Sequence, residues 1–248
     1  MISCICCTSA SRAWCLPLAI RAFSRQTYAA WDRELVIVTD GTDADRDIVA
    51  AIASGHPGVE HYHIPSKPGA TRRITLGEKR NLAIVHARGD WLCHWDDDDW
   101  HSPDRLTRAI KELALQGARA AGMTSLLFHE LTGDRRTFRY RYSGKPYLVG
   151  GTMLYHRNDW RDIRFPRRQE GEDSVFAFEL CRRVTVAIVD DLSHYVALRH
   201  GNNTSHRGQT NPRPPKWVQW EGDIRSIMGQ DLDEYERALH GSRENQER

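Results

Sequence analysis

Short apolar runs bounded by turn-forming residues recur along the first hundred residues of the chain. Residues 2–7 form a nearly continuous apolar run, as in a strand that is covered on both faces of a parallel sheet. Four runs have the length and composition of such strands, namely residues 2–7, 35–38, 59–64 and 91–95. The pattern therefore predicts a row of buried strands in the first half of the chain.

Segments with helical spacing separate these strands. Pro17 suits the first turn of one helix, and Gly89 ends another that covers residues 77–87 and turns Leu82 and Val85 inward. The other apolar positions at helical spacing are Leu16, Ile20 and Phe23 in the first helix, and Ile48, Val49 and Ile52 in a further one. This alternation predicts an α/β fold, with a Rossmann-like, mostly parallel central sheet flanked by helices.

The second half of the chain continues the alternation less regularly. We expect a strand over residues 148–155, where the adjacent Gly150 and Gly151 permit either a close backbone approach to a ligand or a bulge. A helix over residues 175–180 and a strand over residues 184–189 follow.

A proline-rich run at residues 209–216 precedes the C-terminal tail. In the tail, apolar residues recur at near-helical spacing, at Trp217, Val218, Trp220, Ile224 and Ile227. We expect a helical tail that packs over the second half of the chain, with binding of an acceptor or a partner as the alternative.

The composition indicates a globular protein but does not indicate which partner it binds. Of the 248 residues, 40% are hydrophobic and 27% are charged, which is typical of a globular protein. The formal net charge of +2 is too balanced for a dedicated nucleic-acid or membrane-surface protein. The first apolar run is too short for a membrane span and no basic segment precedes it, so we expect no transmembrane segment and a cytoplasmic location.

Six cysteines are present, and three of them lie within the first apolar run. Successive side chains of a strand point to opposite faces, so these three cannot converge on one metal ion without a bend. We expect buried, unpaired thiols.

Polar residues follow three of the predicted strands. Thr8 follows the first, Asp40 and Asp43 follow the second, and Asp96 to Asp99 follow the fourth. Ligands of such sheets bind beyond the carboxyl ends of the strands, so these residues form a candidate site. Four adjacent carboxylates repel one another unless a cation is near, and oxygen ligands favour Mg²⁺ or Mn²⁺. The alternative is a solvated acidic turn in which Asp99 or Ser102 caps the next helix.

Several short motifs together resemble the family 2 glycosyltransferases, which use a nucleotide-sugar donor and have the GT-A fold. The resemblance covers residues 2 to about 205. It rests on residues 5–8, 26–28, 36–43, 77–83, 89–91, 95–99 and 171–173, which occur in the order and on the elements that the family shows.

The resemblance implies roles for the residues at the strand ends. Thr8 and Asp40 resemble positions that hold the nucleotide base. Asp96 and Asp98 resemble the Asp-x-Asp pair, in which the first carboxylate approaches the ribose and the second binds the metal, so Asp98 is the principal expected ligand. Asp99 is expected to assist the metal directly or through water.

The helix over residues 77–87 returns to the same edge of the sheet. Its Lys79 and Arg80 either contact the donor diphosphate or lie on an exposed helix face. Asn81 either supports the nucleotide pocket or binds only backbone groups.

Farther along, residues 171–174 open a helix, which places Asp173 in its cap region. The resemblance implies that Asp173 is the general base of an inverting transfer, since one carboxylate must take the proton of the acceptor hydroxyl. The alternative is that Asp173 is an N-cap. Family resemblance also allows His200 or His206 to ligate the metal, against the alternative that His194, His200 and His206 are surface residues of a loop.

The expected organisation is one GT-A domain followed by a tail. Residues 1–105 would bind the nucleotide sugar, with UDP-sugar as the favoured donor, residues 106–215 would bind an acceptor, and residues 216–248 would form the helical tail. The acceptor, whether glycan, lipid or small molecule, stays open. Two other functions compete: a two-metal phosphoesterase or nucleotidyltransferase that also uses Glu172, and a non-catalytic nucleotide-sugar-binding module.

Overall fold

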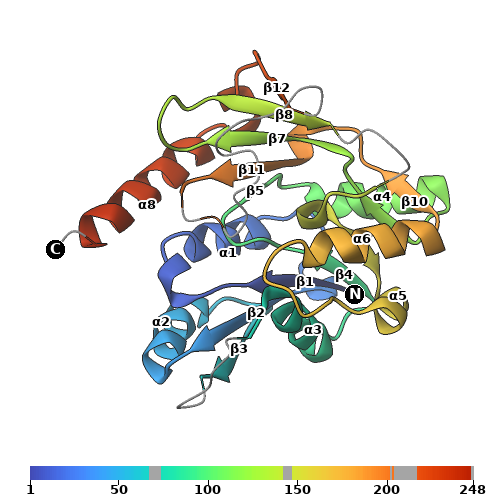
Figure 1. The fold of residues 1–248 in the computed structure, drawn as a ribbon, viewed down its shortest axis with the longest axis horizontal. Helices are drawn as coiled ribbons and strands as arrows, with labels where there is room; N and C mark the ends of the chain where they lie inside the picture. The colour runs from blue at the N-terminus through green and yellow to red at the C-terminus, as the bar shows by residue number, and fades with distance from the viewer. Residues whose placement is uncertain (67–73, 142–146, 202, 204–216, 247–248) are drawn as a thin grey trace.

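The computed structural model describes residues 1–66, 74–141, 147–201, 203 and 217–246 of the chain. Within these residues, helices cover both faces of one long sheet, and a second, smaller sheet lies beside it (Figure 1). The expected α/β class with a mostly parallel central sheet is confirmed.

The four strands predicted in the first half pair in parallel at the centre and at one edge of the long sheet. They run in the order β4-β1-β2-β3, and each begins or ends within a few residues of its expected bounds. Their bounds are Ile2–Cys7 (β1), Arg33–Gly41 (β2), Val59–Pro65 (β3) and Trp91–His94 (β4). Because these strands are parallel, their carboxyl ends meet at one edge of the sheet.

Three strands from the second half complete this sheet in the order β10-β6-β9-β4. They are Ala120–Gly122 (β6), Leu154–His156 (β9) and Val186–Ile188 (β10), and β9 is antiparallel to both of its neighbours. The strand expected over residues 148–155 is therefore wrong in its first part, because residues 150–152 form a 3₁₀ turn, η3 (Gly150–Thr152). That turn brings the paired glycines against other side chains, as described below.

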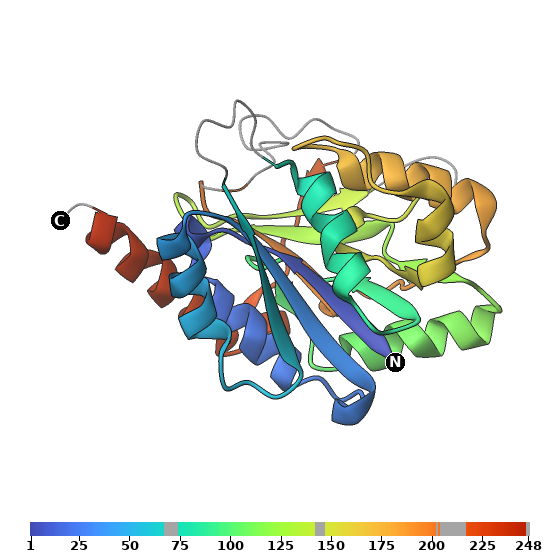
Figure 2. The same cartoon turned by 90° about the horizontal axis from the view of Figure 1, so that it is seen from below.

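Helices pack on both faces of the long sheet (Figure 2). One face carries α1 (Leu16–Ser24), α2 (Asp43–Ala53) and α4 (Arg105–Gln116). The opposite face carries α3 (Leu76–His86), α5 (Arg157–Ile163) and α6 (Glu172–Arg183). Both α2 and α3 begin with a capping box, in which a threonine side chain and an acidic side chain three residues later satisfy each other's backbone N–H groups.

The inward face of α3 differs from the expectation. Val85 is 60% exposed, whereas Ala83 and Ile84 are fully buried. Residues 82–85 are all apolar, so the sequence alone does not fix which of them face inward. Gly77 and Arg80 also lie on the buried face. The reason is that Arg80 packs inward to meet carboxylates, as shown below.

The second sheet was not predicted from the sequence. Its strands lie in the order β12-β8-β7-β11-β5, and only the β7–β11 pair is parallel. Their bounds are Trp100–His101 (β5), Ser125–Glu130 (β7), Thr137–Arg141 (β8), Tyr195–Arg199 (β11) and Trp217–Gln219 (β12). These strands are short, so their alternation gives little signal in the sequence.

The C-terminal tail packs on one face of this second sheet, as expected. Helices α7 (Arg225–Met228) and α8 (Asp231–Gln246) place Met228 and Leu232 against Leu127 and Leu198. The start of the tail is not helical, because Trp217 begins strand β12, which pairs with β8. Figure 1 shows α8 beside the smaller sheet.

Short 3₁₀ turns complete the described elements: η1 (Ala10–Arg12), η2 (Ala30–Asp32) and η4 (Leu192–His194). The six cysteines are unpaired, and four of them are buried, as expected. None of the helices in the described part of the chain combines the length and hydrophobicity that crossing a bilayer requires.

Candidate active site

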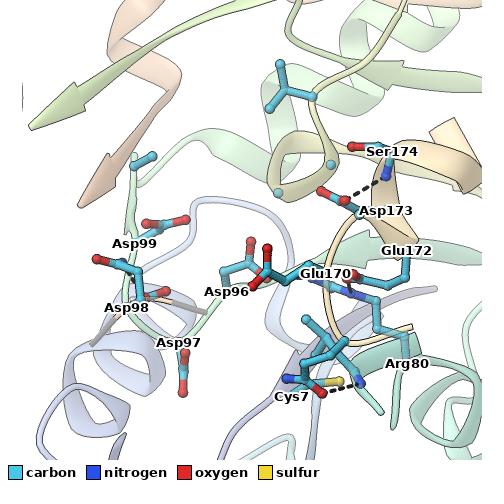
Figure 3. Close-up of a pocket in the computed structure, with 18 of the residues that line it drawn as sticks. Cys7, Arg80, Asp96, Asp97, Asp98, Asp99, Glu170, Glu172, Asp173 and Ser174 are labelled. Carbon is cyan, nitrogen blue, oxygen red and sulfur yellow. Dashed lines mark hydrogen bonds and ion pairs between the residues drawn. The ribbon is translucent and has the colours of Figure 1, made fainter. Parts of the chain in front are cut away.

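A cavity of about 1170 Å³ opens at the edge where the carboxyl ends of the parallel strands meet. The loops after β1, β2 and β4, the first turns of α3 and α6, and the free face of the second sheet all contribute to its lining. Figure 3 shows Asp97, Asp98 and Asp99 on one side of this cavity and Asp173 on the other, with Asp96 between them. The structure thus brings the predicted acidic loop and the predicted base into one cavity.

Asp97 is held by the loop that follows β1. The hydroxyl of Thr8 donates to its Oδ2 at 2.6 Å, and Arg12 donates from Nη2 to Oδ1 at 2.6 Å and from Nε at 3.0 Å. Burial raises the pKa of Asp97, although Arg12 opposes this shift. Arg12 is not predicted from the sequence. The only sequence feature that could have indicated it is its position, four residues after Thr8 at the end of the same strand.

Asp98 receives three donors. Arg12 forms an ion pair with its Oδ2, and His200 Nε2 and Asn203 Nδ2 each lie 3.0 Å from that atom. Burial by itself would raise the pKa of Asp98, but Arg12 and His200 outweigh it and hold the pKa well below the ordinary value. Asp98 is therefore a carboxylate whose negative charge is already balanced by cationic and polar groups.

Asp99 connects the acidic loop to the second sheet. Its Oδ2 accepts a hydrogen bond from the hydroxyl of Tyr195, and its Oδ1 accepts one from the backbone N–H of Leu198 at 2.9 Å. Burial and the nearby charges of Asp98 and Asp96 raise its pKa well above the ordinary value. Both carboxyl oxygens thus serve the attachment to β11, so this geometry gives Asp99 a positioning role.

His200 and His194 are buried, which contradicts the alternative that they are surface residues of a loop. The ring of His200 packs edge-on against Trp14, with centroids 4.9 Å apart, and its Nε2 faces Asp98. His194 lies in η4, and its backbone carbonyl accepts a hydrogen bond from the N–H of Ser102 at 3.2 Å. His206 falls outside the described residues.

Arg80 joins two helices to the acidic loop. Its Nε donates to Glu172 Oε1 at 3.1 Å, and its Nη2 donates to Asp96 Oδ1 at 3.1 Å. Although burial opposes its charge, Asp96 and Glu172 raise the pKa of Arg80 well above its usual value. Arg80 is 4% exposed, so the expectation of an exposed helix face does not hold for it.

Asp173 lies in the first turn of α6 and lines the cavity. The N-cap of that helix is Gly171, in the left-handed conformation with φ of 72°, so the alternative that Asp173 is the N-cap is wrong. The backbone N–H of Ser174 donates to Asp173 Oδ1 at 2.6 Å. A Cβ added at Gly150 would lie 1.9 Å from Asp173 Oδ2, so only glycine fits beside this carboxylate.

Lys79 and Asp40 form an ion pair at the edge of the cavity, and Lys79 Nζ also donates to the carbonyl of Thr8 at 3.1 Å. Asn81 does not line the cavity. Its side chain accepts hydrogen bonds from Trp160 Nε1 and the backbone N–H of Phe165, and donates to the carbonyl of Phe165. Asn81 therefore anchors α5 and the segment after it, and because one of its partners is the Trp160 side chain, the alternative that it binds only backbone groups does not hold in full.

The described residues contain no ready group of three His, Cys, Asp or Glu side chains that could hold a metal ion. Asp98 Oδ2 and His200 Nε2 are nevertheless 3.0 Å apart. Adjacent ligands of an octahedral ion with bonds of about 2.1 Å are separated by about 3.0 Å, so this pair has the spacing of two metal ligands. One carboxylate, completed by water and phosphate oxygens, fits a Mn²⁺ or Mg²⁺ ion, and the imidazole favours Mn²⁺ of the two.

One comparison with known proteins gives a family. The family model described as glycosyl transferase family 2 matches residues 12–164, which is more than half of the chain. No curated protein sequence matches.

Solved structures match over most of the chain. The crystal structure of S. aureus TarS 1-349 in complex with UDP-GlcNAc has a TM-score of 0.62 at 17% identity, over 97% of this chain and 66% of that one. The complex of the same protein with UDP has a TM-score of 0.61 at 18% identity, over 80% and 60% of the two chains.

A third match is the mannosyltransferase PcManGT from Pyrobaculum calidifontis in complex with GDP-Man and Mn²⁺. Its TM-score is 0.58 at 18% identity, over 80% of this chain and 56% of that one. This chain thus spans less than two thirds of the length of these structures. At such identities the likeness shows a common fold.

Proposed function

Because this chain belongs to glycosyl transferase family 2 and has the GT-A fold, we propose that it moves a sugar from a nucleotide diphosphate donor to an acceptor hydroxyl, with inversion at the anomeric carbon. The observation that carries the proposal is that the acidic loop and Asp173 line one cavity. A single displacement needs this arrangement, since leaving group and base act on opposite faces of the sugar.

The donor site that we propose is the edge formed by Thr8, Asp40 and Lys79. Structures with similar folds contain UDP, UDP-GlcNAc or GDP-Man, which supports a nucleotide-sugar donor here, with UDP-sugar favoured. Lys79 holds Asp40 and the Thr8 carbonyl in place, and its ammonium group and Arg80 supply positive charge near the diphosphate. Asp96 lies between the rest of the acidic loop and Asp173 (Figure 3), where the ribose or the transferred sugar would lie.

We propose that Asp98 and His200 hold a divalent ion, Mn²⁺ or Mg²⁺. Bound there, the ion would supply positive charge to the departing diphosphate. In this chain Arg12 keeps Asp98 ionised and fixed, and Asp99 ties the loop to β11 through Tyr195 and Leu198. A structure with a similar fold contains Mn²⁺ together with GDP-Man, which supports the choice of ion.

We assign the general base to Asp173. The Ser174 N–H holds Oδ1, which leaves Oδ2 on the cavity side beside Gly150 to accept the proton of the acceptor hydroxyl. Arg80 fixes the start of α6 through Glu172, and thereby fixes the position of Asp173. Glu172 is paired with Arg80, and the two-metal phosphoesterase, which would use Glu172 as a ligand, is kept as the alternative. The cytoplasmic location expected from the sequence stays a prediction.

The test compares two carboxylates of the same cavity. Asp173→Asn should lower sugar transfer by roughly 10²- to 10⁴-fold, while the affinity for the donor nucleotide stays unchanged. Glu170→Gln is the matched comparison, because Glu170 also lines the cavity but has no proposed proton-transfer role. Turnover with UDP- and GDP-sugars, calorimetry with the matching diphosphate, and NMR of the product anomer are the measurements.

Each outcome has a distinct meaning. If turnover is unchanged in Asp173→Asn, or is lost in Glu170→Gln instead, Asp173 is not the general base. A product that retains the anomeric configuration would contradict the single displacement. Nucleotide-sugar binding without any transfer by the wild-type chain would favour the non-catalytic binding module.

A further inference from the structure

Three aromatic side chains form one wall of the cavity, and the proposed transfer gives this wall no role. Phe128, Tyr140 and Trp217 come from β7, β8 and β12, and all three are partly exposed and line the cavity. Their rings touch in a tilted arrangement. Ring centroids of Phe128 and Trp217 are 4.6 Å apart, and those of Tyr140 and Trp217 are 5.0 Å apart. We call these three residues the aromatic wall.

The strand register explains why the wall faces the cavity. Tyr140 pairs with Leu126 on one side and with Trp217 on the other, so these three residues form a row across three strands. Leu127 and Leu198, on the opposite face of the sheet, pack against the C-terminal helices. The helices thus take one face of the second sheet, and the aromatic face is left toward the cavity.

The wall is continuous with the proposed base. Phe128 and Val149 belong to the same apolar cluster, and Val149 precedes Gly150, the residue against which Asp173 lies. A molecule that rests on the wall therefore reaches Asp173 along the surface of Val149. The donor edge near Thr8 and Asp40 belongs to the other sheet, so the wall is placed for an acceptor.

A charged pair lies beside the wall. Ala197 pairs with Phe128, and two residues later Arg199 pairs with Glu130, so this pair shares the face of the sheet that carries the wall. Arg199 lines the cavity, its Nη1 lies 3.3 Å from Glu130 Oε1, and the side chain is 10% exposed. Among the described residues, none accepts a hydrogen bond from its Nε. Nε is thus a buried donor without a partner in the described part of the chain.

We propose that the aromatic wall and Arg199 bind a pyranose of a glycan acceptor. A pyranose has an apolar face of C–H groups, which the negative face of an aromatic ring attracts, and a rim of hydroxyl groups that accept and donate hydrogen bonds. The rings of the aromatic wall match the C–H face, and the neighbouring pair of Arg199 and Glu130 matches the hydroxyl rim. A lipid chain would use the rings alone and leave the buried Nε of Arg199 without a partner. The role as acceptor rests on the proposed transfer, whereas binding of the sugar does not.

The experiment measures binding of simple sugars by saturation-transfer NMR, with the methyl glycosides of glucose, galactose, mannose and N-acetylglucosamine as probes and octyl phosphate as the lipid-phosphate probe. At least one glycoside should bind the full chain, with the strongest transfer to its ring C–H protons. Trp217→Ala should weaken this binding about tenfold, and Trp217→Phe should retain most of it. Val218→Ala is the control, because Val218 is adjacent, 53% exposed and on the other side of the strand.

Phe128→Leu serves as the second variant and should show the same loss, which covers the case in which Trp217→Ala does not fold. Absence of binding by every glycoside, or equal affinity in wild type and in both wall variants, would overturn the proposal. Binding of octyl phosphate in place of the glycosides would overturn it in favour of a lipid acceptor. Calorimetry with UDP and GDP on the same samples tests the donor site separately, so its failure would count against the proposed transfer and not against the wall.

Discussion

Nε of Arg80 lies 3.1 Å from Oε1 of Glu172, and this hydrogen bond fastens the middle of α3 to the first residue of α6. Nη2 of the same guanidinium reaches Asp96. One buried arginine thereby sets the distance between the acidic loop and the helix turn that carries Asp173. The geometry of the proposed reaction depends on a residue that need not touch the reacting atoms.

Replacing this arginine should be costly. Arg80→Met leaves two carboxylates without their partner, and loss of one member of a buried ion pair costs about 3–5 kcal/mol of unfolding free energy. Arg167→Met is the matched control, because the ion pair between Arg167 and Glu78 lies at the surface and Arg167 is 74% exposed. Urea unfolding should show a change of less than about 1 kcal/mol for the control. Equal destabilisation of both variants would refute the bridging role of Arg80.

Nucleotide binding should depend on a divalent ion. Calorimetry with UDP or GDP should show tighter binding in Mn²⁺ than in excess chelator, because the ion would join Asp98 to phosphate oxygens. In Asp98→Asn the gain in affinity from Mn²⁺ should be at least about tenfold smaller, which is about 1.4 kcal/mol of binding free energy. Asp104→Asn, an acidic residue outside the cavity lining, should keep the full gain. Affinity that is the same with Mn²⁺ and with chelator would argue against the metal.

Adding a single methyl group at Gly150 should impair catalysis. Its Cβ would lie 1.9 Å from Asp173 Oδ2, so the carboxylate must move away. Moving a catalytic group by about 1 Å costs roughly 10²-fold in turnover. Gly241→Ala is the control, because a Cβ added at Gly241, in helix α8, would have no side chain or distant backbone of the described residues within 4 Å. Alanine there should leave turnover unchanged. Full activity of Gly150→Ala would show that the position of Asp173 is not critical.

Stability should decline in mild acid, and His194 is one of four buried histidines, with His94, His101 and His129, whose pKa burial lowers. Burial, with help from Arg105, lowers the pKa of His194 to about 3, whereas the unfolded chain takes up the proton near pH 6.5. The stabilisation is therefore complete above pH 6.5 and is lost as the pH falls from 6.5 toward 3, by about 3 kcal/mol at pH 4. His194→Leu should flatten the curve of unfolding free energy against pH over this range. A curve with the wild-type slope would assign the acid sensitivity to other groups.

The sequence predicted the long sheet better than the small one. Strands β1 to β4 and helices α1 to α3 have strong apolar runs or capping residues, and their carboxyl-end loops placed Thr8, Asp40 and the acidic loop correctly at one edge. The second sheet has strands of two to six residues, which are too short to show periodicity. Without that sheet, neither the burial of His200 nor the bond from Tyr195 to Asp99 was predictable.

Long-range partners explain the rest. Arg12 meets Asp97 and Asp98 some 85 positions later in the chain, and no local pattern reports such a contact. Apolar spacing alone predicts an inward Val85, whereas the observed helix turns Arg80 inward, where it pairs with carboxylates. Electrostatic contacts across the fold thus override hydrophobic spacing at the site itself.

Strand β9 has a consequence for recombining members of the family. It comes from the second half of the chain, yet it lies between β4 and β6 and forms backbone hydrogen bonds with both. A chimera joined near residue 105 would therefore combine strands from two parents within one hydrogen-bonded ladder. The strands of the small sheet alternate along the chain with β6, β9 and β10, so a graft that changes the small sheet and leaves this ladder intact needs a separate pair of junctions around each exchanged segment.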